Sequence, residues 1–160
     1  MSARGVRRAL GASALWWACT THAAIVVFTD GWMRPVSAGA ASADAYVDVR
    51  ADAALAIVGV RTGIARAVEL VAAPAPADGN AAASATRDAR HFMLAPGEKL
   101  RFARHGNVLR LHDITRSVSV GDTVRLEFAF EDARRHPQAA TATIVVRGVL
   151  PPAPAGATGH

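Results

Sequence analysis

Cysteine is nearly absent from this 160-residue chain: Cys19 is the only one, and it lies in an apolar N-terminal stretch. The rest of the chain can therefore form no internal disulfide, no thiolate metal site and no cysteine nucleophile. Aromatic residues are also few, at 6% of the chain, although 51% of the residues are hydrophobic. We therefore expect a single domain whose core is built from short runs of Val, Leu, Ile and Phe.

Catalytic motifs are missing as well. No serine lies in a nucleophile-elbow motif, and the chain has no glycine-rich phosphate loop. His112 and Asp113 are neighbours in the sequence, but consecutive residues of a strand point to opposite faces and cannot act as a pair. We predict that the protein is not an enzyme.

The formal charge of +5 is concentrated at the N-terminus. Four basic residues and one acid precede Asp44, so 14 basic and 12 acidic residues remain, and the rest of the chain has a net charge of +2. These basic residues are dispersed, with no stacked aromatic residues between them, so we predict no nucleic-acid binding. A related hypothesis is that the basic protein binds an anionic surface. It is weaker than the two functional hypotheses that are developed at the end of this subsection.

The N-terminus has the form of an export signal. Basic residues lie between Arg4 and Arg8, and residues 9–28 follow without a charge, which matches the basic and apolar regions of a signal. Ala41-Ser42-Ala43 has the small-x-small form of a peptidase site. We therefore expect residues 1–43 to be a cleaved signal peptide or a signal anchor. The protein would then be periplasmic, with the membrane contacted only through this segment.

Cys19 offers another way to tether the chain. A lipoprotein signal places its cysteine after aliphatic and small residues, whereas Trp16 and Trp17 lie at these positions here. We therefore favour a cleaved signal or an anchor over lipidation.

From Ala45 onward, short runs of β-forming residues alternate with turn residues, which is typical of a β-sandwich or barrel. The pattern is clearest where Val124, Leu126, Phe128 and Phe130 share one face of a strand and charged residues lie on the other. The expected strands are residues 45–49, 54–60, 67–72, 91–94, 99–103, 108–114, 123–130 and 141–146.

Two stretches are rich in Ala, Pro and Gly, namely residues 73–90 and the tail 150–160. Neither can bury enough apolar surface to offset the entropy of ordering it. We expect a mobile connection between strands in the first and a disordered terminus in the second.

Four segments resemble, in their order and spacing, the PCu(A)C family of periplasmic copper chaperones. The resemblance implies an all-β, cupredoxin-like or immunoglobulin-like Greek-key sandwich over residues 44–149. It also implies copper(I) as the cargo and copper-accepting assembly proteins of respiratory oxidases as partners, and we expect a monomer. The segments are Asp44-Ala45-Tyr46-Val47, Ala67-Val68-Glu69-Leu70, Leu94-Ala95-Pro96-Gly97-Glu98-Lys99-Leu100 and Val118-Ser119-Val120-Gly121-Asp122-Thr123-Val124.

The copper ligands of that family are missing at their expected positions. In the family, a His follows the Val-Glu-Leu strand, a Met lies in the connection after it, and a His-x-Met pair lies on the strand after the Pro-Gly hairpin. The corresponding positions here are Val71, about Ala85 or Thr86, Val108 and Arg110, and Arg110 would repel a bound cation. The resemblance therefore supports the fold and export, and it supports a copper site only by association.

A different copper site could be built from His91, Met93, His105 and His112. His91 and Met93 would share one face of a strand, and they would converge with His112 if that strand lay beside residues 108–114, with His105 reaching in from a hairpin. Imidazole and thioether ligands favour copper over calcium or magnesium. The alternative is that these side chains have ordinary surface or core roles. The protein would then be a metal-free binding module that acts through a protein surface.

Overall fold

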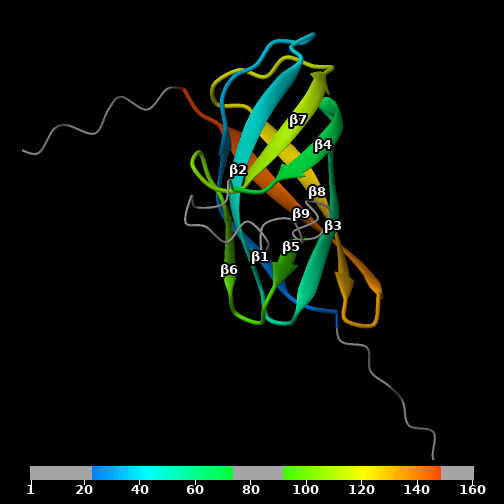
Figure 1. Ribbon diagram of the computed structural model, residues 1–160. Coiled ribbons are helices and arrows are strands. Elements are labelled where there is room, and N and C mark those ends of the chain that lie inside the picture. Colours follow the sequence, from blue (N-terminus) through cyan, green and yellow to red (C-terminus); the bar gives the residue numbers. More distant parts are fainter. Residues whose placement is uncertain (1–22, 74–91, 149–160) are drawn as a thin grey trace, which may run out of the picture.

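A computed structural model describes residues 23–73 and 92–148 of the chain, and these residues form nine strands and no helix (Figure 1). The all-β prediction is confirmed, and each expected strand is found, residues 108–114 with the expected ends and the others with at least one end shifted. No helix in these ranges could cross a membrane. The strands are β1 (Val26–Met33), β2 (Ser42–Ala51), β3 (Leu55–Thr62), β4 (Ala65–Val71), β5 (Phe92–Leu94), β6 (Lys99–Phe102), β7 (Val108–Ile114), β8 (Thr123–Asp132) and β9 (Pro137–Val146).

The strands form one curled sheet that wraps around the hydrophobic core. The order is β4-β7-β2-β1-β9-β8-β3-β5, with β6 paired to the far part of β2. The curl brings β3 against β4, although these strands lie near opposite ends of the order. The inner surface of the sheet is thereby closed off from water, and the outer surface carries the polar side chains.

The core follows from the alternation of apolar and polar residues. On β8, Val124, Leu126, Phe128 and Phe130 are at most 1% exposed, as the pattern predicts, while the residues between them are exposed. β9 supplies the matching Ala142, Ile144 and Val146 from the neighbouring strand. Two aromatic contacts extend this layer: Phe128 lies 6.0 Å from Phe130 and 4.9 Å from Phe28 on β1, measured between ring centroids.

β1 corrects the domain boundary that the sequence suggested. β1 pairs antiparallel with β2 and parallel with β9, and its last residue, Met33, is fully buried. The expected cleavage point after Ala43 lies inside β2. The folded domain therefore begins at Val26 rather than at Asp44, because the apolar run that resembled the end of a signal is partly a strand. Three parts of the chain lie outside the described residues: the first 22 residues of the expected signal, the connection beyond Ala73, and the tail.

Two turns have a glycine where the backbone requires one. Gly97 in the turn between β5 and β6 and Gly121 before β8 have φ angles of 74° and 93°, a conformation that L residues with a side chain rarely adopt. The β8–β9 turn uses a different device. The Asp132 carboxylate accepts hydrogen bonds from the backbone N–H groups of Arg134 and His136, at 2.7 and 2.8 Å. Its other oxygen lies 3.0 Å from Nδ1 of His136.

The Asp132 turn leads to a prediction about pH. The backbone hydrogen bond from His136 is the main cause that lowers the pKa of Asp132 below its ordinary value of 3.8. The ionised carboxylate therefore stabilises the fold fully above pH 3.8, and this stabilisation is lost as the pH falls through the lower folded pKa. Asp132→Asn is expected to lower the urea midpoint at pH 7, and the difference from the unmodified protein should shrink below pH 3.8.

Glu131→Gln is the matched control, since it removes a carboxylate from the neighbouring position without touching the turn. A loss of stability for Asp132→Asn that is the same at pH 7 and pH 3 would show that the charge of Asp132 has no part in the turn.

Candidate functional site

The positions where the PCu(A)C resemblance places copper ligands meet on the outer face of β4 and β7. Val71 is opposite Val108, and Glu69 is opposite Arg110, in the antiparallel pairing of the two strands. Residues two apart on a strand share a face, so Val71 lies beside Glu69 and Val108 beside Arg110. The sequence comparison thus identified a real cluster, but the cluster holds two valines and an arginine instead of ligands.

Arg110 is fixed in this cluster by an ion pair. Its Nε lies 3.0 Å from Oδ1 of Asp44, the residue opposite it on β2. The hydrogen bond to Asp44 is the main cause that raises the pKa of the guanidinium above its ordinary value. Arg110 therefore stays cationic, and a metal ion at this place would be repelled by it.

His112 lies further along the same face of β7, where it is already paired. Its Nε2 is 2.9 Å from Oε2 of Glu69 on β4. The expected convergence of His112 with Met93 required β5 to lie beside β7. That expectation is wrong, because β7 pairs with β2 and β4, whereas β5 pairs with β3.

Met93 and His105 lie in two separate places. Met93 is 66% exposed on β5, because the residues on either side of it face inward and Phe92 contacts Phe102 at a centroid distance of 5.5 Å. His105 is exposed in the connection between β6 and β7. His91 lies outside the described residues. Within residues 23–73 and 92–148, no group of three or more His, Cys, Asp or Glu is close enough to hold a metal ion.

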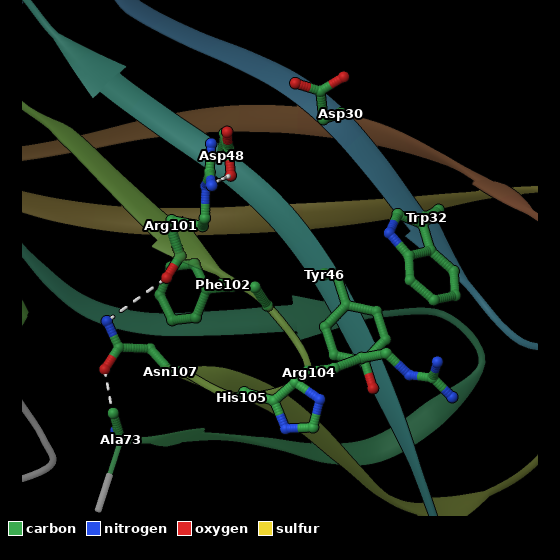
Figure 2. Close-up of a pocket in the computed structure, with 12 residues that line it drawn as sticks. Asp30, Trp32, Tyr46, Asp48, Ala73, Arg101, Phe102, Arg104, His105 and Asn107 are labelled. Atoms are coloured by element: carbon green, nitrogen blue, oxygen red, sulfur yellow. Dashed lines mark hydrogen bonds and ion pairs between the residues drawn. The ribbon is translucent and has the colours of Figure 1, made fainter. Parts of the chain in front are cut away.

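A pocket of about 680 Å³ lies between β1, β2 and the β6–β7 connection (Figure 2). It contains His105 but none of the other candidate ligands. The sequence pattern did not predict this pocket, because two of its residues, Asp30 and Trp32, lie within the segment that resembles an export signal. A β-bulge between Thr29 and Trp32, where Asp30 has a φ angle of 54°, is the local feature that turns them outward, and bulges often re-aim side chains next to functional sites.

Two polar residues hold the wall of this pocket in place. Asp48 is only 6% exposed, and its carboxylate lies 3.2 Å from Nζ of Lys99 and 3.4 Å from Nε of Arg101. The side chain of Asn107 accepts a hydrogen bond from the backbone N–H of Ala73 and donates one to the carbonyl oxygen of Arg101 (Figure 2). These contacts connect β2, β6 and the residues that flank β7 into one wall of the pocket.

Comparisons with known proteins agree with the fold. Residues 26–142 match the model of the LpqE-like family, which is described as a lipoprotein family, and the match begins at β1. The chain is similar to the apo PCuAC domain from PmoF1, with a TM-score of 0.58 and 17% identity over 77% of this chain and 93% of that domain. It is also similar to the copper-bound PCuAC domain from PmoF2, with a TM-score of 0.57 and 22% identity over 77% and 92% of the two chains.

The comparison with curated proteins gave no match. At these identities the structural matches establish the fold, and the predicted cupredoxin-like or immunoglobulin-like β-sandwich is confirmed. The resemblance to the PCu(A)C family is confirmed with it, while the correspondence of Val71, Val108 and Arg110 to the ligand positions of that family stays a prediction.

Proposed function

This chain belongs to the LpqE-like family and has the fold of PCuAC domains, and on this premise we propose that it is an exported protein of the copper-handling class. Its cargo would be copper(I), passed in the periplasm to copper-accepting proteins that assemble respiratory oxidases. The basic and apolar N-terminal segment supports export. The copper-bound state of the similar PmoF2 domain supports the cargo.

The exposure of Met93 is the observation that carries the copper proposal. A methionine usually fills space in a core, yet this one is 66% exposed on the short strand β5. His91 precedes it by two residues, so the chain has a His-x-Met sequence at this place. A thioether and an imidazole are ligands that suit copper(I), and an exposed site lets a partner protein approach the ion and take it.

A copper(I) titration against a competing chelator tests this proposal. The full chain is expected to bind one equivalent. Met93→Ala and His91→Ala should each weaken binding about tenfold or more, because the loss of one ligand from a site with few ligands removes a large share of the binding energy.

His112→Ala is the matched control for this titration. It removes an imidazole that is paired with Glu69 on a different strand, and it should leave the affinity for copper(I) unchanged. Copper(I) binding that survives both Met93→Ala and His91→Ala would overturn the assignment of these ligands.

A second function is favoured by the β4–β7 cluster. Val71 and Val108 replace soft ligands, and Arg110 adds a fixed positive charge. This arrangement supports a metal-free binding module that has kept the fold and acts through a protein surface. The absence of any tight copper(I) binding in the titration would favour this function over copper handling.

A further inference from the structure

The pocket in Figure 2 has one wall made of two aromatic rings. Trp32 on β1 and Tyr46 on β2 are opposite each other in the strand pairing, and their rings lie 4.6 Å apart at an angle of 40°. Trp32 is half-buried, and Tyr46 is 8% exposed. Phe102 also lines the pocket. Aromatic faces of this kind offer a large contact area to a flat apolar ligand.

Two carboxylates near these rings are paired with cations. Lys99 and Arg101 hold the buried Asp48, as described above, and Arg110 holds the partly exposed Asp44. Asp30 also borders the pocket, and it is exposed, as Arg104 is, so water screens both charges. Because two cations, Lys99 and Arg101, share the single carboxylate of Asp48, the charged groups at the pocket keep a net positive charge.

Two further arginines add positive charge at one end of the pocket. Arg104 borders the aromatic pocket and also an adjoining depression that Arg34, Arg110 and Tyr46 line. Neither Arg34 nor Arg104 forms an ion pair with another described residue. The pKa of Tyr46 is raised, chiefly by burial and next by the charge of Asp44, and Arg34 and Arg110 oppose this rise. The three arginines line the depression together with Asp44 and Tyr46, so they lie beside the same ring that forms the aromatic wall.

We propose that this pocket binds a small aromatic carboxylate, with the ring of the ligand against Trp32 and Tyr46 and its carboxylate hydrogen-bonded to Arg104 and Arg34. A guanidinium binds a carboxylate through two parallel hydrogen bonds, and a flat apolar ring fits the aromatic wall. The site lies on β1, β2 and the β6–β7 connection, apart from Met93 on β5. Met93, the proposed copper ligand that the structure describes, does not line this pocket.

A second pocket shows why charge alone does not carry this assignment. This second pocket is lined by three arginines, Arg61, Arg116 and Arg125, and by Glu127. Its lining has no aromatic side chain. It offers charge without a surface for a ring, and it supplies the control for the experiment.

Benzoate, benzamide and inorganic phosphate are suitable probes for an NMR titration of the full chain. Benzoate has both the ring and the charge, whereas each of the other two has one of them. Benzoate is expected to shift the indole N–H signal of Trp32 and to saturate, with a dissociation constant on the order of 1 mM. Benzamide and phosphate should each bind about tenfold more weakly. Trp32→Phe assigns the indole signal.

Variants then separate the specific site from general charge. Arg104→Gln should weaken benzoate binding about tenfold, because a charge-assisted pair is lost. Arg61→Gln removes the same charge from a side chain that is 85% exposed in the second pocket, and it should have no effect. Met93→Ala should also have no effect, since the copper proposal does not involve this pocket.

Three results would overturn the proposal: no saturable shift of Trp32 with benzoate, phosphate binding as tight as benzoate binding, or equal effects of Arg104→Gln and Arg61→Gln. Because Arg104 is exposed, its replacement leaves the core intact, and an unchanged amide spectrum verifies this.

Discussion

A chain that begins at Asp44 is expected not to fold, whereas a chain that begins at Ala23 keeps every strand of the domain. β1 lies between β2 and β9 in the sheet, so its removal leaves one edge of each strand unpaired. Met33 and Phe28 leave the core with it. Truncating one buried residue of this size costs about 2–5 kcal/mol, and a domain has only about 5–15 kcal/mol of stability in total.

Urea unfolding followed by circular dichroism measures the difference between these two chains. The chain from Ala23 should show a cooperative transition, and the chain from Asp44 should show none. A cooperative transition with the same midpoint in both chains would mean that β1 adds nothing to the fold.

This result would limit where an export signal can be removed. Cleavage after Ala43 cuts into β2 and separates β1 from the domain, so processing that preserves the fold must occur before Val26. Cys19 precedes this limit, so a cut at Cys19 would leave β1 in the domain.

β8 could be predicted from the sequence because one of its faces is buried and the other faces water. On β8, every second residue is apolar, and one buried face alone produces this pattern. β1 escaped prediction because its first residues, Val26 to Phe28, continue an apolar run that begins at residue 9. The bulge at Asp30 then shifts the register, so a strict alternation never develops.

One signal for β1 was present in the sequence. A Cβ atom on Gly31 would lie 2.6 Å from Cγ2 of the buried Ile144, and a glycine inside a strand often marks such a close approach. That meaning becomes clear only when the neighbouring strand is known.

The candidate metal sites also depend on which strands are neighbours in the sheet. The β4–β7 cluster could be predicted because a family pattern carries strand pairing within it, and the observed register of Val71 with Val108 agrees. The relocated site depended on which strand lies beside β5, and nothing local in the sequence determines this. The aromatic pocket combines β1, β2 and the β6–β7 connection, so it could not be assembled until those segments were in place.

Putting the family ligands back into the β4–β7 cluster is expected to create a copper(I) site. The variant combines Val71→His, Val108→His and Arg110→Met. Directly opposite residues of antiparallel strands have Cβ atoms about 4.5–5.5 Å apart, so the two imidazoles would reach a common ion. The methionine would lie two residues along on the same face. Two imidazoles and a thioether suit copper(I), and the replaced arginine no longer repels it.

The variant is best made in a Met93→Ala background, so that the proposed site on β5 does not contribute. We expect the affinity for copper(I) to rise from the weakened level of the Met93→Ala chain to tight binding of one equivalent in competition with a chelator. Arg110→Met alone is the matched control, because it removes the same ion pair with Asp44 but supplies one ligand instead of three. If the triple variant binds no more copper(I) than this control, the likeness to PCuAC domains ends at the fold. If the triple variant binds copper(I) more tightly than this control, the fold can still position a copper site on β4 and β7, and the residues at these three positions are what keeps copper(I) from binding there.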